Sequence, residues 1–498
     1  VESALDEYGK EWVAMHTDAC EATRLRGEQT EDVLSLRMIC LDRRLVSLGA
    51  LAKVFMAADQ KTVEKSLDAA LALPKMRGCA DVEALKSPTP LPEDPKTRAK
   101  VDEIERTLAE AKALMDSGNL TRSLELAEGA AREARVTGYK PVMAEALHLD
   151  GWALARLQKG EALKRGEELL QQAVAAAEEG RLDPEKARAL TKLVYAAGYM
   201  EGNATQAALW QRLAEAAVKR VGSAELEADL LNNMGNVYLR HGRLAEGAAT
   251  LAKAAELASR EWGEADPRTN IILANWASAL KGINKPDEAL TVITRSLAAL
   301  EKTRGADNPT AASQRRVLGL VYLDLKDYRH AYDELQRAIK IHTASLGPES
   351  LEVAADLDWL AVTLQSDGLY AEALEEAQRS LKIREKVLPS TSMILALSLE
   401  NIGQAQLSLR KPLDAIPNLE KAVGLYDRNG QEPSESAEAR FALARALWDG
   451  NRDRRRAVAL AEQARSGYEA KKDTEHVRGV TEWQQAHAPG ALKGGSRR

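Results

Sequence analysis

The feature that most constrains the fold of this chain is a pattern that returns every 42 residues. Each copy has a small residue, which recurs as Gly235, Ala277, Gly319, Ala361 and Gly403. A second set of small residues follows at the same spacing, as Gly247, Ala289, Ala331, Ala373 and Ala415. Most copies then have a large apolar residue, in the series Leu251, Ile293, Leu335, Ala377 and Leu419. Small residues allow two helices to cross closely and large ones fill the space between neighbouring pairs, so the pattern predicts an array of paired helices.

The joints between the copies repeat as well. Glycines return at the 42-residue spacing, and two of them precede an Asp-Pro or Asn-Pro step: Gly263, Gly305 and Gly347, with Asp266-Pro267 and Asn308-Pro309. Glycine suits the left-handed cap that ends a helix, whereas Asp or Asn before Pro is typical of a helix start. Because one helix pair cannot bury its apolar face alone, we expect an all-α fold, a right-handed α-α superhelical solenoid preceded by a small helical N-terminal unit.

Four segments are expected along the chain. A stretch with four prolines in eight residues, from Pro88 to Pro95, separates an N-terminal segment from the repeats. In the first segment, apolar residues at helical spacing predict helices over 2–25, 30–58 and 60–73. The expected segments are 1–86, a helical hairpin plus a short helix; 87–97, a Pro-rich linker; 98–470, a solenoid of about nine helix pairs; and 471–498, a C-terminal helix end and a disordered tail.

The repeats resemble a known family. The 42-residue spacing, the Leu231-Asn232-Asn233 step shortly before Gly235 and the glycine joints are similar to the kinesin-light-chain subtype of tetratricopeptide repeat. The resemblance covers most of residues 98–470. It implies a non-catalytic scaffold whose partner is a protein or a peptide.

A second resemblance covers residues 1–95. Three stretches, 19–29, 36–45 and 73–81, are similar to a juxtamembrane segment of large serine/threonine protein kinases of myxobacteria and their relatives. In those proteins a cytoplasmic kinase domain precedes one transmembrane helix, and this segment plus repeats follows on the far side. The resemblance implies a sensor region on the extracytoplasmic (periplasmic) face of the inner membrane, held there only through an upstream anchor. The chain begins at Val1 rather than at Met, so we expect a fragment or a processed product.

The sequence lacks the features that are typical of enzymes, metal-binding proteins and nucleic-acid-binding proteins. It has no phosphate-binding loop, dinucleotide-binding, kinase, hydrolase or zinc-protease motif, so we expect no enzymatic activity and no cofactor. The seven histidines are scattered and the three cysteines lack metal-ligand spacing, which argues against a metal site. The net charge of −6, without a basic face, argues against nucleic acid. An intracellular adaptor, the sensor end of a nucleotide-binding switch ATPase in signalling or defence, and a regulatory subunit of a protease remain as alternatives.

The tetratricopeptide resemblance also implies which side chains line a peptide-binding groove. In such repeats, the fifth and ninth residues of the first helix and residues at its end face the groove. Here these positions hold Asn232, Asn236, Arg240, Ser278, Lys281, Arg316, Asp358, Glu400 and Gln404. We expect the three cations to form a strip that binds carboxylates, flanked by Asn side chains that bind peptide backbone, before the groove turns acidic. Alternatively, Asn232 and Asn233 tie adjacent helices together.

Two further expectations concern single residues. Replacing Arg316 by Glu is expected to weaken the binding of an acidic peptide by about 1–3 kcal/mol and to leave stability almost unchanged. The cysteines Cys20, Cys40 and Cys79 all lie near the N-terminus, where the predicted hairpin sets Cys20 and Cys40 on facing helices. We expect at most one disulfide among them, with the pairing open, or else three buried thiols.

Overall fold

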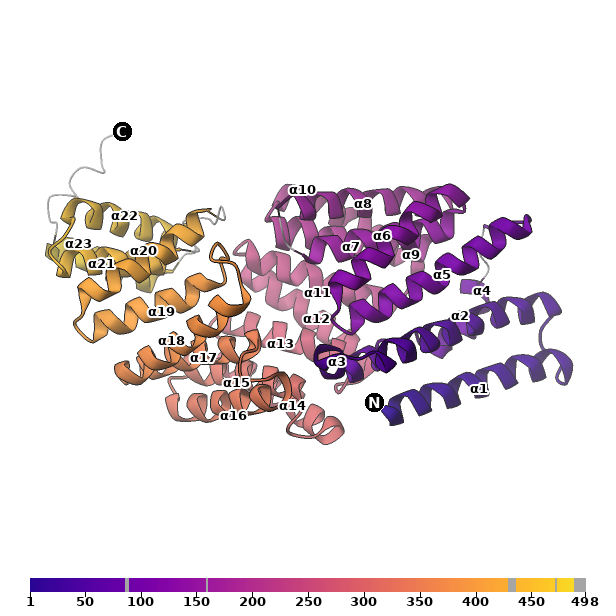
Figure 1. Ribbon diagram of the computed structural model, residues 1–498, viewed down its shortest axis with the longest axis horizontal. Coiled ribbons are helices and arrows are strands. Elements are labelled where there is room, and N and C mark those ends of the chain that lie inside the picture. Colours follow the sequence, from indigo (N-terminus) through magenta and orange to yellow (C-terminus); the bar gives the residue numbers. More distant parts are fainter. Residues whose placement is uncertain (86–88, 158–159, 429–435, 471–472, 488–498) are drawn as a thin grey trace. The chain divides into compact units, whose positions relative to one another are not determined.

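The computed structural model describes residues 1–85, 89–157, 160–428, 436–470 and 473–487 (Figure 1). Every regular element in these ranges is helical, and none of them is a β-strand. The chain forms two compact units, Val1–Ile283 and Asn284–Arg498, and each is described by itself. The prediction of an all-α fold is therefore confirmed.

The first unit begins with the predicted hairpin, in which α1 (Glu2–Arg24) packs against α2 (Glu31–Met56) (Figure 1). Three short elements follow, namely α3 (Gln60–Leu71), η1 (Met76–Cys79) and α4 (Val82–Leu85). A disulfide joins Cys40 on α2 to Cys79 on η1, with 5.6 Å between their Cα atoms. Cys20 is a free, half-buried thiol. One bridge among the three cysteines agrees with the expected maximum, and the structure specifies its partners.

The hairpin shares a core with the first repeat. Leu41 and Leu51 pack in one cluster with Ala113 and Leu114 of α5 (Pro95–Asp116). Ion pairs reinforce this contact, because Arg43 lies 2.5 Å from Glu105 and Lys53 lies 2.7 Å from Glu110. A two-helix hairpin has an apolar stripe that it cannot cover alone, and α5 covers it. Residues 1–86 therefore do not enclose a core separate from the array.

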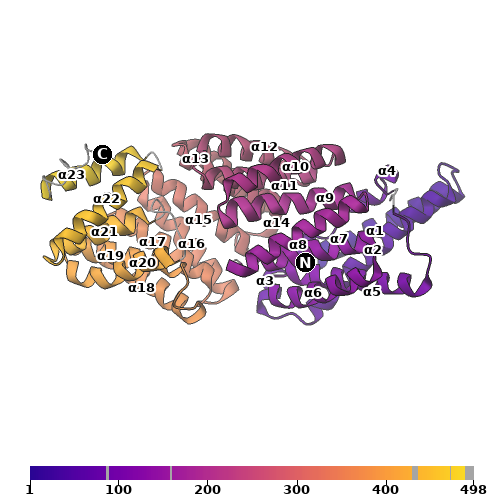
Figure 2. The ribbon, with the colours of Figure 1, turned by 90° about the horizontal axis from the view of Figure 1, so that it is seen from above.

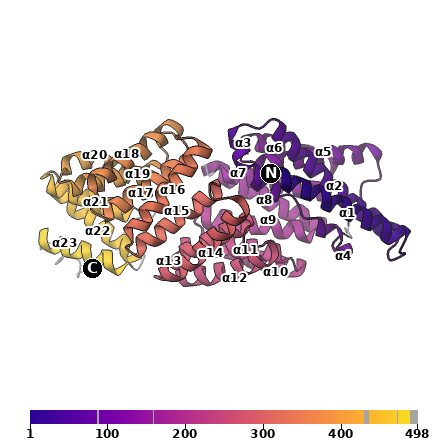
Figure 3. The same ribbon diagram turned by 90° about the horizontal axis from the view of Figure 1, so that it is seen from below.

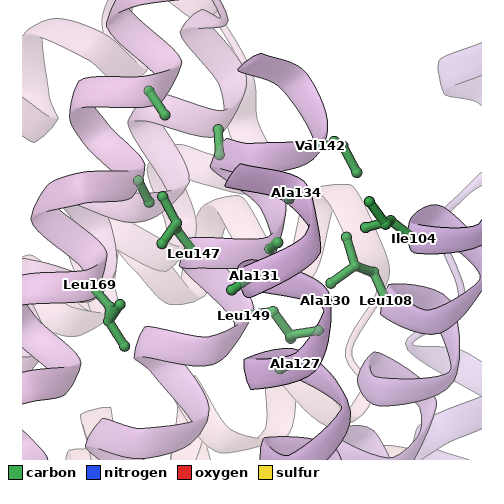
Figure 4. Close-up of a cluster of buried hydrophobic side chains, with 14 of the residues drawn as sticks. Ile104, Leu108, Ala127, Ala130, Ala131, Ala134, Val142, Leu147, Leu149 and Leu169 are labelled. Carbon is green, nitrogen blue, oxygen red and sulfur yellow. The ribbon is translucent and has the colours of Figure 1, made fainter. Parts of the chain in front are cut away.

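The rest of the first unit is a series of antiparallel helices, each packed on the next (Figure 2). After α5 these elements are α6 (Leu120–Thr137), α7 (Lys140–Arg156), α8 (Gly160–Glu179), α9 (Asp183–Tyr195), the π-helical turn η2 (Ala196–Glu201), α10 (Ala204–Val221), α11 (Ala224–Arg240), α12 (Leu244–Trp262) and α13 (Pro267–Gly282). Figure 4 shows how small side chains permit this packing, since the alanines of α6 face Ile104 and Leu108 of α5.

The second unit repeats the arrangement (Figure 3). Its helices are α14 (Pro286–Arg304), α15 (Pro309–Asp324), α16 (Tyr328–Leu346), α17 (Leu351–Ser366), α18 (Tyr370–Val387), α19 (Leu395–Ser408), α20 (Pro412–Arg428), α21 (Ala437–Asp449), α22 (Arg454–Ala470) and α23 (Thr474–His487). The predicted disordered tail falls on residues 488–498, which lie outside the described residues, as do residues 87 and 88 of the predicted linker.

The small residues and the N-caps of the repeat have the roles predicted for them, whereas the glycine joints differ in part. A Cβ on Gly403 would lie 2.4 Å from Cγ of Leu419, so the close crossing of α19 and α20 requires glycine at this place. Gly305 has a φ of +83°, which favours glycine, but its ψ of 155° differs from that of the left-handed helical cap expected at the joint. The Asn308 side chain caps α15 by accepting a hydrogen bond of 2.8 Å from the Thr310 amide. Among the described helices, none has both the length and the apolar character needed to cross a membrane.

Candidate functional site

The first helices of successive pairs form one layer in the first unit. Helix α5 contacts α7, α7 contacts α9, α9 contacts α11 and α11 contacts α13. Glu145 on α7 is exposed to solvent, yet desolvation by the surrounding protein raises the pKa of its carboxyl, and Glu105 adds to this rise. We call the side of the layer that carries Glu145 the inner face.

Three aromatic rings with a cation at each end form a row on this face. The Nζ atom of Lys192 lies 5.1 Å from the centroid of the Trp152 ring, and Trp152 meets Tyr195 edge to face with 6.2 Å between centroids. Tyr195 stacks on Tyr199 at 4.8 Å, and the guanidinium carbon of Arg240 lies 5.8 Å from the Tyr199 ring centroid. These five residues, from α7, α9, η2 and α11, form a continuous row that we call the ring–cation strip.

The strip is positively charged. Lys192, Arg240 and the neighbouring Arg156 have no ion-pair partner among the described residues. Burial, together with the charges of Lys192, Arg188 and Lys112, lowers the pKa of His148, one turn before Trp152, to about 3, so this imidazole is neutral at pH 7. Burial also raises the pKa of Tyr195 to about 12, which keeps its phenol neutral. Cations without an ion-pair partner attract anionic groups.

A π-helical turn positions Tyr199. Helix α9 continues into η2, and Gly198 within this turn is required because a Cβ there would lie 2.6 Å from the Val237 side chain. A ring nitrogen of His241 lies 3.1 Å from the Gly198 carbonyl oxygen and fixes the turn to the end of α11. Isolated π-turns are frequent at functional sites, and this one brings Tyr199 beside Arg240. Sequence reasoning missed the aromatic residues of the strip, although the four-residue spacing of Tyr195 and Tyr199 was visible in a chain with only 4% aromatic residues.

Predicted groove residues of the first unit lie on α11 and α13. Arg240 belongs to the ring–cation strip, and Asn236 lies one turn before it, with its side-chain amide 2.9 Å from the Asn232 carbonyl oxygen. The Asn232 side-chain oxygen accepts a hydrogen bond of 3.0 Å from Asn275 on α13. This hydrogen bond links α11 to α13. Asn233 is buried and donates to the Thr191 carbonyl oxygen at 3.1 Å, as the structural alternative predicts. On α13, Ser278 is exposed and Lys281 is half-buried.

The predicted groove residues of the second unit are placed differently. Arg316 binds the fully buried Asp356 at 2.7 Å, and Asp358 is itself fully buried and lies 2.6 Å from Arg384. Glu400 is only 7% exposed and accepts a hydrogen bond of 3.2 Å from the Tyr426 hydroxyl. Half-buried Gln404 donates to Glu438 at 2.8 Å.

These positions differ from the predicted groove, which was expected to change from basic to acidic along its length. Asp358 and Glu400 lie between helices, where they contact Arg384 and Tyr426, and so they do not make a groove surface acidic. Arg316 is engaged with Asp356 inside the second unit, whereas Arg240 and Lys281 belong to the first. No group of three or more histidine, cysteine or acidic side chains suited to a metal ion occurs within the described part of the chain.

Comparison with known proteins supports the repeat assignment. Residues 309–386 and 354–428 match a family model described as tetratricopeptide repeat, so this part of the second unit carries such repeats. Protein KINESIN LIGHT CHAIN-RELATED 1 of Arabidopsis thaliana is 25% identical over 186 residues, which cover 34% of this chain and 29% of that protein. The match thus spans less than a third of the relative's length.

Two solved structures are also similar to this chain. The apo form of RapI is 15% identical, with a TM-score of 0.51, and the alignment covers 76% of this chain and 98% of RapI. A Rap protein complexed with Competence and Sporulation Factor is 15% identical, with a TM-score of 0.45, over 73% of this chain and 99% of that one. At this identity RapI shows the fold alone, namely paired helices stacked in series.

Proposed function

We propose that this chain is a binding scaffold that holds an acidic, extended peptide segment of a partner protein on the inner face of the first unit. The observation that carries the proposal is the ring–cation strip, in which Lys192 and Arg240 flank a row of three aromatic rings. Charge-assisted hydrogen bonds from the cations would hold carboxylates, and the rings would cover the apolar parts of the peptide.

The dimensions suit a short peptide. Packed helices lie 8–10 Å apart, so the distance from α7 across α9 to α11 is roughly 20 Å. An extended chain advances about 3.3 Å per residue, which gives about six residues for this span. Asn236, one turn from Arg240, adds an amide that can donate to or accept from peptide backbone.

Replacing Arg240 by Glu is expected to weaken the binding of such peptides about 10- to 100-fold, the effect of losing one hydrogen bond to a charged group. A peptide array with varied acidic content would first select ligands, and calorimetry would then compare wild type, Arg240→Glu and Trp152→Ala. Stability should change little with Arg240→Glu, because Arg240 is exposed and has no ion-pair partner among the described residues.

The matched control is Arg260→Glu, the same charge change at an exposed residue of α12. Its affinity for the selected peptides should stay within about twofold of wild type. If the best peptides bind Arg240→Glu as tightly as wild type, or if they protect the second helices of the pairs from hydrogen exchange, the peptide does not bind on the inner face.

We also propose that the chain is the sensor region of a membrane-anchored bacterial serine/threonine kinase. This finer assignment rests on the resemblance of residues 1–95. The Cys40–Cys79 disulfide supports it, because disulfides persist in oxidising compartments such as the periplasm. In any longer protein that contains this chain, a kinase domain and an apolar segment of about 20 residues ahead of Val1 would agree with the assignment. A phosphate-binding loop there would instead indicate a switch ATPase.

A thiol count tests the compartment. Protein prepared from an oxidising compartment, unfolded without reductant, should react with a thiol reagent at one cysteine per chain, Cys20, because the other two are bridged. After reduction the count should rise to three. Three reactive thiols before reduction would contradict both the disulfide and the periplasmic assignment.

A further inference from the structure

One helix pair carries a carboxyl at a position that is apolar in the five copies of the 42-residue pattern. The residue before the first small position is Met234, Trp276, Leu318, Leu360 or Ile402 in the five copies of the 42-residue pattern. Two repeat lengths before Gly235 stands Gly151, and the residue before it is Asp150. A polar residue at an intended core position breaks the pattern that stabilises the array, and such exceptions occur mainly at functional sites.

The structure supports this alignment of Gly151 with Gly235 and of Asp150 with Met234. A Cβ on Gly151 would lie 2.8 Å from the Gly166 carbonyl oxygen, and a Cβ on Gly247 would lie 3.1 Å from the Gly235 carbonyl oxygen. Thus Gly151 and Gly166 mark the crossing of α7 and α8 as Gly235 and Gly247 mark that of α11 and α12. Asp150 therefore occupies the place of Met234 and is 4% exposed, against 6% for Met234.

The Asp150 carboxylate has no partner within the part of the chain that the structure describes. It takes part in no hydrogen bond and no ion pair there. A deeply buried carboxylate without a protein partner calls for donors from the cavity that it lines, either water or a ligand.

Asp150 lines a cavity of about 260 Å³ between α6 and α8. The other lining residues are Glu128, Arg132, Arg135, Arg165, Glu168, Leu169 and Gln172. At the rim, Glu128 lies 3.3 Å from Arg132 and 3.6 Å from Arg165, and Arg135 donates to Gln172 at 2.8 Å. The cavity therefore joins a buried acidic group to an exposed group of three guanidiniums, with Leu169 as an apolar wall.

We propose that this cavity binds a free α-amino acid, with the ligand's ammonium group on Asp150 and its carboxylate on the rim arginines. An ammonium group supplies the donors that the buried carboxylate lacks, and guanidinium forks match a carboxylate in geometry and charge. The volume is below the roughly 300–1,000 Å³ of sites for drug-sized ligands, which favours a small metabolite. Leu169 suits a ligand with a small aliphatic side chain.

The ionisation of Asp150 gives the binding a pH dependence. Burial raises the pKa of Asp150 to about 6, and Glu128 adds to the rise, while Arg165, Arg135 and Arg132 oppose it. Glu168 on α8 is the remaining charged group of the lining. Because the ligand's ammonium group requires the ionised carboxylate, affinity should fall as the pH drops below about 6.

The test is a thermal-shift and calorimetry screen of the full chain with the common amino acids at pH 7.5. At least one should bind, whereas its N-acetyl derivative, which lacks the ammonium group, and its methyl ester, which lacks the carboxylate, should bind about 10- to 100-fold more weakly. In Asp150→Leu, which restores the apolar residue of the other repeats, the ligand-free melting temperature should rise and the ligand-induced shift should disappear. Asp150→Asn provides a second variant that keeps the shape of the side chain and should also lose the shift.

Glu161→Gln, at an exposed residue of α8, is the control and should keep the full ligand-induced shift. The proposal is overturned if no amino acid binds wild type, if the ester or the N-acetyl derivative binds as tightly as the parent, or if either Asp150 variant keeps its affinity.

Discussion

Replacing Arg384 by Met is expected to destabilise α17 and α18 of the second unit by about 3–5 kcal/mol, the range for removing one partner of a buried ion pair. The Arg384 side chain on α18 is 6% exposed, and its Nη2 atom lies 2.6 Å from Oδ2 of the fully buried Asp358 on α17. Without the guanidinium, that oxygen would keep a hydrogen bond of 3.2 Å from Ser398. The other oxygen, Oδ1, has no hydrogen-bond partner among the described residues even in the intact pair.

The size of this loss should depend on pH. Burial raises the pKa of Asp358 to about 6, although Arg384 opposes the rise. A carboxyl whose pKa is higher in the folded state than its unfolded value of about 3.9 reduces stability as the pH rises through the interval between the two values. Removing Arg384 takes away the opposing charge and extends this interval above pH 6. The loss should therefore be largest near pH 8 and smaller near pH 5, where the proton on Asp358 removes the buried charge.

Hydrogen–deuterium exchange of α17 and α18 at pH 5 and pH 8, corrected for intrinsic exchange, would measure the loss. Arg379→Met is the matched control on the same helix, because Arg379 is 54% exposed in a surface pair with Glu376 and should contribute less than about 1 kcal/mol. The double variant Arg384→Met with Asp358→Leu should recover most of the stability, since an apolar pair can replace a buried ion pair. Equal exchange in Arg384→Met and wild type would show that the pair does not stabilise these helices.

The repeat fold could be predicted because its determinants are local and periodic. The small residue at position 403 and the positive-φ glycine at position 305 belong to series that return every 42 residues, so one copy supports the interpretation of the next. The helices of the N-terminal hairpin were also predicted within about two residues of their observed ends from apolar spacing alone. Such signals do not depend on contacts between distant parts of the chain.

The candidate site was harder to predict because it depends on which side of a helix faces a neighbour. Repeat position alone assigned Asp358 and Glu400 to an exposed groove, but the partners that allow their burial, Arg384 and Tyr426, lie 26 residues further along in each case. Tyr199 was missed for a related reason, because a π-turn shifts it by a fraction of a helical turn toward Arg240. A pattern that repeats along the sequence does not reveal the partner of a buried side chain on another helix, nor the shift that a π-turn causes.

The substitution Arg316→Glu is now expected to have a large effect on stability, contrary to the expectation from sequence. The Arg316 side chain is 22% exposed, and its Nη1 atom lies 2.7 Å from Oδ1 of the fully buried Asp356. The second oxygen of Asp356 lies 2.6 Å from Nδ1 of the buried His342. Glu at this position would remove one partner of Asp356 and place a like charge beside it. We expect a loss of about 3 kcal/mol, the lower end of the range for a broken buried pair, because Arg316 is partly exposed.

Hydrogen exchange of α15 and α17, measured together with peptide affinity, separates the two expectations for Arg316. The control is Arg329→Glu, the same charge change at an exposed residue of α16, which should leave exchange within about 0.5 kcal/mol of wild type. Arg316→Lys, which keeps a cation beside Asp356, should retain more stability than Arg316→Glu. If Arg316→Glu instead leaves exchange unchanged and weakens acidic-peptide binding, Arg316 is free to bind ligand and the groove assignment extends into the second unit. If exchange accelerates while peptides selected on the ring–cation strip bind as before, Arg316 is a structural partner of Asp356 and recognition lies in the first unit.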